Sequence, residues 1–314
     1  MKTQLLYVLV STPEDLYLEQ ALISIASARL RNPDARIILL TDREMPQLSA
    51  CVDQTVTVNL DPALPAMKRS RLLKTGMRRY VKGDFLYIDA DTLVTASLEA
   101  IDQVEAPLAA CLDLHMPLKD HSHRAAIINT CKKLGYDVSA APLYFNGGVM
   151  LARDTPQVHE FFECWTRNYE AGYARGVRSD QPSLAQTIAQ TGLVPLRLED
   201  SWNCQALHGV RYLREARIFH YLCTNASSRE NGYAYSLHNP EVLLDVRKNG
   251  VQAVQDIIQD PFRGFPPYTQ VFSGQDLYFF RTRRYRWLRK GYRPGKCSLL
   301  EFVLKVWDHL TGRV

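Results

Sequence analysis

The feature that most constrains the fold is a regular alternation of apolar runs and amphipathic segments over residues 4–115. The run LLYVLVS (5–11) is nearly continuous in apolar residues, as expected for a parallel strand covered on both faces. Residues 14–32 follow with leucine and isoleucine at helical spacing. This strand–helix–strand pattern predicts an α/β domain with a mixed, mostly parallel central sheet flanked by helices. Ligands bind such sheets beyond the carboxyl ends of the strands.

The same patterns predict the later elements and the domain organisation. Further strands are expected within residues 33–42, 54–60, 84–89, 143–153, 194–200 and 217–222, and a helix–strand unit is expected over 97–115. Helices are expected at 67–81, which is basic, at 156–173 and after residue 180, and an inserted loop with one helix is expected at 116–141. We expect an α/β domain over residues 1–225, a loop-rich extension over 226–276, and a basic, aromatic and helical tail over 277–314.

Composition places the chain among soluble globular proteins, since 46% of its 314 residues are hydrophobic and 23% are charged. No run approaches the roughly 20 apolar residues that cross a bilayer. The apolar run near the N-terminus is short and acids follow it, so we interpret it as a strand rather than a signal peptide. Seven scattered cysteines without a C-x-x-C pair indicate free thiols in a reducing compartment.

The segment FLYIDADTLV (85–94) places Asp89 and Asp91 one residue apart at the end of an expected strand. In isolation such a pair is more typical of a solvated turn. Here apolar residues precede and follow it, and buried carboxylates are costly unless they are paired or bind a metal. Hard cations such as Mg²⁺ and Mn²⁺ prefer oxygen ligands. The pair is therefore a candidate site for a divalent cation.

Three further motifs contain candidate site residues, and each has a structural alternative. Asn146 and Gly147 stand in the strand YFNGGVMLAR, where two glycines admit either a ligand or a β-bulge. Asp180 and Gln181 stand at a helix start, where an N-cap is the structural alternative. His220 ends an apolar strand, where a lone histidine is more often a hydrogen-bonded core residue.

In chain order, the D-x-D after a strand, F-N-x-G-V, D-Q, W-N and F-H-Y resemble the family 8 glycosyltransferases, the group of glycogenin and bacterial lipopolysaccharide galactosyltransferases. The resemblance spans about residues 4–225. It implies a GT-A fold, the fold of nucleotide-diphospho-sugar transferases, and a UDP-sugar donor held through Mn²⁺ or Mg²⁺. It favours transfer of a hexose with retention of the anomeric configuration, in the synthesis of a bacterial surface or lipopolysaccharide saccharide.

The resemblance also implies a role for each matching residue. Asp89, Asp91 and His220 would bind the metal. Asp180 and Gln181 would line the reacting anomeric carbon as the catalytic pair. The donor contacts implied by the resemblance are Ser11, Thr12, Arg71, Asp89, Ala90, Asp91, Asn146 and Gly147.

The chain departs from that family's pattern after His220, where the stretch HYLCTNASSRE (220–230) lacks the expected glycine and lysine. In that family the lysine grips the donor diphosphate, so either Arg229 or a helix residue such as Lys74 substitutes for it here, or the contact with the leaving group differs. Pro182 also replaces the second acid after D-Q. These departures bear on the prediction of the subfamily and of the transferred sugar more than on the prediction of the fold.

The net charge of +5 comes from the tail, because residues 277–300 contain eight cations and no acid. Interleaved aromatic residues fit an anionic membrane surface, single-stranded nucleic acid, or a basic face packed on the domain. We favour the membrane surface, because residues 298–310 add an apolar helix face and a lipid-linked acceptor would need it. Nucleic acid is not an expected partner. The expected location is the cytoplasm, free or on the inner face of its membrane.

Other interpretations stay open. A sugar-nucleotide-forming nucleotidyltransferase would carry an early glycine-rich loop, and VSTPEDLY (10–17) has no glycine. A non-catalytic homologue that binds sugar nucleotides is compatible with the missing lysine. The cluster Asp113, His115, His121 and His123 has zinc-binding residue types in a spacing that fits no standard zinc site, so we interpret it as a loop beside the site.

Overall fold

A computed structural model describes residues 1–205, 214–222, 233–266 and 306. The chain divides into two units, Met1–Thr269 and Gln270–Val314, and the description below concerns the first. Apart from residue 306, the predicted tail at 277–314 lies outside the described residues. Among the helices that are described, none combines the length and the apolar character needed to cross a membrane.

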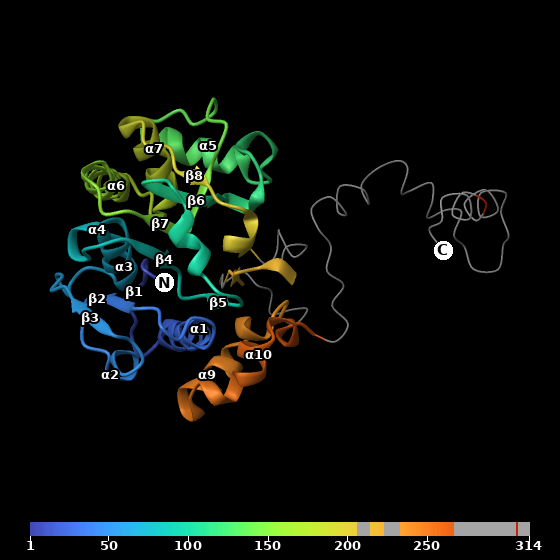
Figure 1. The fold of residues 1–314 in the computed structure, drawn as a ribbon. Helices are drawn as coiled ribbons and strands as arrows, with labels where there is room; N and C mark the ends of the chain where they lie inside the picture. Colours follow the sequence, from blue (N-terminus) through green and yellow to red (C-terminus); the bar gives the residue numbers. More distant parts are fainter. Residues whose placement is uncertain (206–213, 223–232, 267–305, 307–314) are drawn as a thin grey trace. The chain divides into compact units, whose positions relative to one another are not determined.

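The central sheet has seven strands in the order β3–β2–β1–β4–β7–β6–β8 (Figure 1). Their bounds are β1 Gln4–Leu9, β2 Ile37–Thr41, β3 Gln54–Thr57, β4 Phe85–Ile88, β6 Leu108–Leu112, β7 Phe145–Ala152 and β8 Leu196–Arg197. β7 runs antiparallel to β4 and β6, whereas the other neighbouring pairs are parallel. The predicted mixed, mostly parallel sheet is confirmed.

Helices cover both faces of this sheet, because successive residues of its strands point to opposite sides. Leu5 and Leu9 of β1 pack in one hydrophobic cluster with the inner side of α1 (Tyr17–Arg31). Leu6 and Val8 pack in a second cluster on the other face. The helices of that face are α3 (Ala66–Thr75), α4 (Met77–Tyr80), α6 (Pro156–Ala174) and α7 (Gln181–Thr191). Two hydrophobic clusters, one on each face of the sheet, thus fix the strand ends at which the candidate site lies.

The basic helix predicted at 67–81 is in fact two helices, α3 and α4, and the break falls at Gly76. α3 begins after Pro65, whose fixed φ suits the residue that precedes a helix. Its buried side faces the sheet through Leu73, whereas Arg71 and Lys74 lie three residues apart toward the strand ends. α3 therefore presents two cations to the edge of the sheet.

A second, three-stranded sheet has the order β5–β10–β9. Its strands are β5 (Thr92–Val94), β9 (Cys204–Gln205) and β10 (Ile218–His220). β5 follows the D-x-D directly and pairs antiparallel with β10, which places Thr92 opposite His220. This pairing brings the D-x-D of β4 and the histidine of a strand 129 residues later to one place.

Beyond residue 225 the expectation of polar loops is wrong for two segments. α9 (Pro240–Asn249) begins at Asn239, whose side chain accepts a hydrogen bond from the Glu241 N–H, and α10 (Gln255–Gln259) follows. A third hydrophobic cluster joins these helices to Ile23 of α1. The remaining helices are α2 (Pro46–Ser49) and α5 (Arg124–Lys133), of which α5 lies in the expected loop-and-helix insertion.

Candidate metal and donor site

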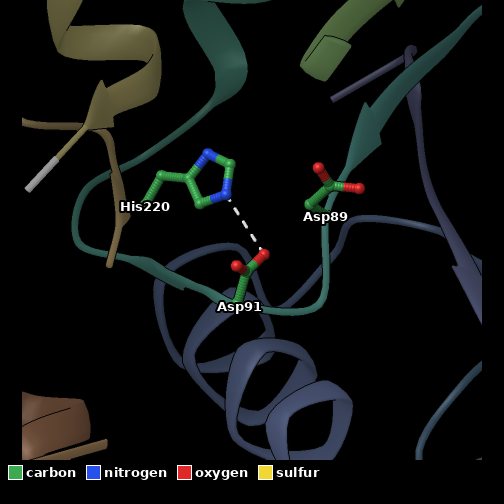
Figure 2. A group of neighbouring side chains, drawn as sticks. All are labelled: Asp89, Asp91 and His220. Atoms are coloured by element: carbon green, nitrogen blue, oxygen red, sulfur yellow. Dashed lines mark hydrogen bonds and ion pairs between the residues drawn. The ribbon is translucent and has the colours of Figure 1, made fainter. Parts of the chain in front are cut away.

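Asp89, Asp91 and His220 lie close together at the carboxyl end of β4 (Figure 2). One ligand atom from each residue lies within 4.8 Å of the other two. His220 Nε2 lies 3.1 Å from Asp91 Oδ1. Within the described part of the chain, this is the group of acids and histidines that is arranged to hold a metal ion. We call these three residues the metal group.

The backbone around the metal group is fixed by hydrogen bonds from neighbouring strands. The Asp89 N–H donates to the Gly148 carbonyl at 2.8 Å, and the Tyr221 N–H donates to the Asp91 carbonyl at 3.2 Å. The Thr92 hydroxyl donates to the Asp89 carbonyl at 2.8 Å. The D-x-D is therefore a structured connection between two sheets and not a solvated turn.

A hydrogen-bonded chain of side chains holds His220 from behind. Its Nδ1 lies 2.9 Å from the Asn203 side-chain oxygen, and the Asn203 amide donates to Asn146 Oδ1 at 2.9 Å. Asn146 in turn donates to Asp113 Oδ1 at 2.8 Å, and His121 contacts the other oxygen of Asp113 at 3.0 Å. With Nδ1–H donated to Asn203, Nε2 faces Asp91. This is the arrangement that orients histidine ligands in metal sites.

Burial and charge oppose each other at His220. Burial disfavours its charged form, but the nearby Asp91 carboxylate outweighs this effect and raises the pKa of His220 above its usual value. Asp91 and then Asp89 therefore make the surroundings of His220 negative. A cation at the metal group would relieve the same negative charge, and two carboxylates with one imidazole suit Mn²⁺ better than Ca²⁺.

Gly148 provides the space that the metal group needs. A Cβ at this position would lie 2.5 Å from His220 Cε1 and 2.8 Å from Asp89 Oδ2. The β6–β7 pairing shifts register between Ala110 and Leu112, opposite the segment that contains the two glycines. The strand is thus irregular at the glycine pair, as a β-bulge would be, and the absence of a side chain at Gly148 also leaves room for His220 and Asp89 to come close to the backbone. The residues present fit a divalent cation.

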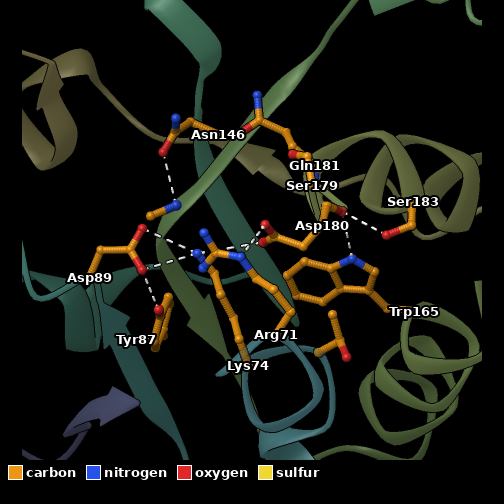
Figure 3. Close-up of polar contacts among 12 residues, drawn as sticks. Arg71, Lys74, Tyr87, Asp89, Asn146, Trp165, Ser179, Asp180, Gln181 and Ser183 are labelled. Atoms are coloured by element: carbon orange, nitrogen blue, oxygen red, sulfur yellow. Dashed lines mark hydrogen bonds and ion pairs between the residues drawn. The ribbon is translucent and has the colours of Figure 1, made fainter. Parts of the chain in front are cut away.

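Beside the metal group lies a cluster of alternating charges formed by Arg71, Asp180, Lys74 and Asp89 (Figure 3). Arg71 Nε lies 3.1 Å from Asp180 Oδ1, and Lys74 Nζ lies 3.6 Å from Asp180 Oδ2. Lys74 Nζ also donates to both Asp89 oxygens at 3.0 and 3.1 Å. The Tyr87 hydroxyl donates to Asp89 as well, and burial, followed by the charge of Asp89, raises the pKa of this phenol well above its usual value.

Asp180 is held in its charged form although it is buried. Burial alone would raise its pKa, but Arg71 and then Lys74 lower it below the usual value. Asp180 occupies the N-cap position of α7, yet its side chain caps no N–H group there. The Trp165 Nε1–H donates to its carbonyl at 3.1 Å, which fixes the backbone. The N-cap interpretation of this acid is therefore wrong, and its carboxylate faces the cations of α3.

Gln181 and Asn146 lie near these clusters but contact protein groups. The Tyr144 hydroxyl hydrogen-bonds with the Gln181 side chain. The side-chain oxygen of Asn146 accepts from the Gly148 N–H at 2.8 Å in addition to Asn203. Their expected contacts with a donor sugar stay predictions, as does the contact expected of Gly147. Gly147 lies on the other face of β7, where a Cβ would be 3.8 Å from Asp180 and Lys74.

Ser11 and Thr12 line a mostly apolar cleft of about 1180 Å³ beside α1, α9 and residues 43–53. The carboxylate of Asp15 holds this segment, since Ser11 Oγ donates to it at 2.5 Å and the Thr12 N–H at 2.8 Å. None of the three metal-group residues lines this cleft. The expected proximity of Ser11 and Thr12 to a nucleotide stays a prediction.

The sequence interpretation missed the supporting roles of Asn203 and Asp113. Asn203 stands in the W-N pair that contributes to the family resemblance, but no role was predicted for its side chain. The suggested zinc cluster does not assemble among the described residues, because Asp113 pairs with His121 while His115 pairs with Asp200 at 3.3 Å. Arg229 lies outside the described residues.

No model of a protein family matches the sequence, and a comparison with curated proteins finds no match. Solved glycosyltransferase structures do match. The apo form of the glycosyltransferase GlyE from Streptococcus pneumoniae TIGR4 is 17% identical, with 87% of this chain and 67% of that chain covered and a TM-score of 0.51.

An active-site mutant of LgtC is 16% identical, with 83% of this chain and 99% of that chain covered and a TM-score of 0.51. LgtC is a galactosyltransferase that has been solved in complex with donor and acceptor sugar analogues. These likenesses confirm the fold class that the sequence predicts. The chain therefore has the GT-A glycosyltransferase fold of GlyE and LgtC.

Proposed function

We propose that this protein is a metal-dependent glycosyltransferase that moves a hexose from a UDP-sugar to a saccharide or lipid-linked acceptor. The observation that supports it best is the convergence of Asp89, Asp91 and His220 at a strand end of a GT-A fold. Sheets of this kind bind their ligands beyond the carboxyl ends of the strands. A turn without function would not need a histidine ligand from β10 or the buried support of Asn203.

The metal group would hold Mn²⁺ or Mg²⁺, which supplies positive charge to a diphosphate leaving group when it is bound. Arg71 and Lys74 add two cations beside Asp180, so positive charge is also available from the protein. This matters because the diphosphate-gripping lysine expected after His220 is missing.

Asp180 and Gln181 are the proposed catalytic pair. The lowered pKa of Asp180 suits a carboxylate that stabilises an oxocarbenium-like sugar and not an acid that protonates the leaving group. Gln181 follows it as the first residue of α7. We propose retention of the anomeric configuration on this basis and on the resemblance of the motifs.

The proposed acceptor is a growing bacterial surface or lipopolysaccharide saccharide. A lipid-linked acceptor lies at a membrane, and the eight cations of residues 277–300 provide charge that would bind an anionic membrane surface. The proposed location is the inner face of the cytoplasmic membrane. Asp89, Ala90, Asp91, Arg71, Asn146, Gly147, Ser11 and Thr12 are the proposed donor contacts.

The test is release of UDP from a panel of UDP-sugars with Mn²⁺, together with calorimetric titration of Mn²⁺ and UDP. Asp91→Asn should abolish UDP release and weaken Mn²⁺ binding by at least about tenfold, because one of three ligands is lost. Asp245→Asn, an exposed acid on α9, is the matched control and should behave as wild type.

Two results would overturn the proposal. If the wild type binds UDP and Mn²⁺ but releases no UDP from any donor with any saccharide acceptor, a non-catalytic binding protein is the better interpretation. If it joins a sugar phosphate to UTP with release of pyrophosphate, it is a nucleotidyltransferase. A wild-type rate in Asp91→Asn would reject the metal assignment.

A further inference from the structure

Lys74 lies inside the site with 5% of its side chain exposed. Its Nζ donates to Asp89 Oδ1 at 3.0 Å and Oδ2 at 3.1 Å, and it lies 3.6 Å from Asp180 Oδ2. The same nitrogen lies 5.0 Å from the centre of the Tyr87 ring. Figure 3 shows this side chain reaching from α3 toward Asp89. Its closest carboxylate is therefore one of the three proposed metal ligands.

A buried lysine has to be explained, because removing an ammonium group from water is costly unless it is paired. The pairing here is double, with Asp89 on one side and Asp180 on the other. Asp180 already has a second cation, since Arg71 Nε lies 3.1 Å from its other oxygen. Among the described ion pairs, both Arg71 and Lys74 pair with Asp180, but Lys74 alone pairs with Asp89.

The local charge balance indicates what this contact does. The acids Asp89, Asp91 and Asp180 face the cations Arg71 and Lys74, so the cluster carries about one negative charge while His220 is neutral. A divalent cation would reverse the sign of this balance. A donor diphosphate that arrived with the metal would restore it. Binding of the metal alone is therefore disfavoured, and binding of the metal together with the diphosphate is favoured.

We propose that Lys74 is an internal cation that competes with the divalent metal for Asp89 and thereby couples metal binding to binding of the donor diphosphate. This inference rests on the proposed function, because it assumes that the metal group binds a metal. The ammonium group keeps a partner in Asp180 when the metal takes Asp89. Lys74 is in this sense a positioning and affinity-setting residue of the donor site.

The test is calorimetric titration of the full chain with Mn²⁺ alone, and then with Mn²⁺ in the presence of UDP. Lys74→Met removes the charge and keeps most of the buried volume. It should bind Mn²⁺ alone about tenfold or more tightly than wild type, since two cations on one carboxylate repel even in a water-like dielectric. The gain in Mn²⁺ affinity that UDP produces should shrink, and the gain in UDP affinity that Mn²⁺ produces should shrink equally, because the coupling is reciprocal.

Two further variants serve as controls. Lys74→Arg keeps the charge and should bind Mn²⁺ as weakly as wild type. Lys68→Met removes a charge from the same helix, where Lys68 lies over the Tyr173 ring at 4.7 Å and away from Asp89, and should leave both affinities unchanged. If the methionine variant fails to fold, Lys74→Gln removes the charge with a polar side chain that can still pair with Asp89, and the same gain in affinity is expected.

The outcomes separate this inference from the proposed function. If wild type binds Mn²⁺ and the charge-removing variants bind it equally or more weakly, Lys74 does not compete and the inference is wrong while the function stands. If neither wild type nor any Lys74 variant binds Mn²⁺, with or without UDP, the metal group is not a metal site and both proposals fall.

Discussion

Gly148 lies between the metal group and Asn146, where there is no room for any side chain. A Cβ would come within 2.5 Å of His220 and 2.9 Å of Asn146 Oδ1. At Gly147 the nearest atoms to a Cβ are 3.8 Å away, which is an ordinary van der Waals distance. Position 148 therefore has no room for a side chain, whereas position 147 has room for a methyl group. The two adjacent glycines form a matched pair for mutagenesis.

We expect Gly148→Ala to lower the free energy of unfolding by about 1–3 kcal/mol, because His220 or Asp89 must move. The same movement should weaken Mn²⁺ binding by about tenfold or more. Gly147→Ala should leave stability and Mn²⁺ affinity close to wild type. Chemical denaturation and calorimetry measure the two quantities. Equal effects of the two substitutions would show that close packing at Gly148 is not what the site requires.

Asn203 holds the ring of His220 through Nδ1 and also supports Asn146. Replacement by alanine removes the acceptor that fixes the ring, so we expect Mn²⁺ affinity to fall about 10- to 100-fold. Asn203→Asp keeps an acceptor for Nδ1–H but loses the donor to Asn146 Oδ1, so it should bind Mn²⁺ more tightly than the alanine variant and less tightly than wild type. If the aspartate variant binds Mn²⁺ as weakly as the alanine variant, orientation of His220 is not the role of Asn203.

These residues also show how far sequence reasoning reaches at this scale. Asp89 and Asp91 were a candidate cation site because two acids stand at the end of an apolar run, whereas His220 was added to them only through the resemblance to the family 8 glycosyltransferases. Asn203 was not assigned a role, because its contact depends on β9 lying beside β10 in a small second sheet. Lys74 was named as one of two substitutes for a missing lysine, but its pairing with Asp89 could be seen only in three dimensions.

At the scale of elements, local patterns predicted the existence of strands and helices better than their direction. The run 143–153 was predicted as a strand, and its antiparallel course between β4 and β6 comes from tertiary pairing. Hydrophobic periodicity does not encode direction, since side chains alternate in the same way in both orientations. α9 and α10 were missed because ten- and five-residue helices between polar stretches give a weak periodic signal.

α9 is attached to α1 by a buried carboxylate. Glu19 is 1% exposed, and Arg247 contacts its two oxygens at 2.6 and 3.1 Å. Arg247 also donates to the carbonyl oxygens of Pro13 and Asp15, next to the segment that contains Ser11 and Thr12. One arginine thus joins the extension to the first loop of the GT-A sheet.

We expect Arg247→Ala to lower the free energy of unfolding by about 1–3 kcal/mol, because it leaves a buried carboxylate without its ion-pair partner. The double change Glu19→Gln with Arg247→Met should be milder than the single one, since no charge is then buried unpaired. Amide hydrogen exchange in residues 11–16 should rise in the single variant. A double variant that is less stable than Arg247→Ala would contradict this account.

At the scale of the whole molecule, charge is divided between two parts of the sequence. The chain carries a net charge of +5, yet residues 277–300 alone contain eight cations and no acid. The remainder is slightly acidic and contains the GT-A fold with its metal group. Such a division suits a catalytic unit whose place in the cell depends on a separate basic segment, and it can be tested without knowledge of the acceptor.

We expect the full chain to sediment with vesicles that contain anionic lipid and to stay in solution with neutral vesicles. Each cation near an anionic surface contributes about 1 kcal/mol, and salt screens this attraction. Raising the salt to about 0.5 M should therefore release the protein. A chain that ends at Thr269 should not sediment, whereas its Mn²⁺ affinity should equal that of the full chain, because the metal group lies within Met1–Thr269.

A full chain that lacks six of the eight cations in residues 277–300 separates the contribution of charge from that of the apolar segment 298–310. Replacing Arg281, Arg283, Arg284, Arg286, Arg289 and Arg293 by glutamine keeps every aromatic residue and the whole segment 298–310. If charge provides the attachment, this variant should lose binding to anionic vesicles as fully as the truncated chain does. If it sediments as well as wild type, or if wild type binds neutral and anionic vesicles equally, electrostatic attachment is wrong and the apolar segment 298–310 is the part that binds.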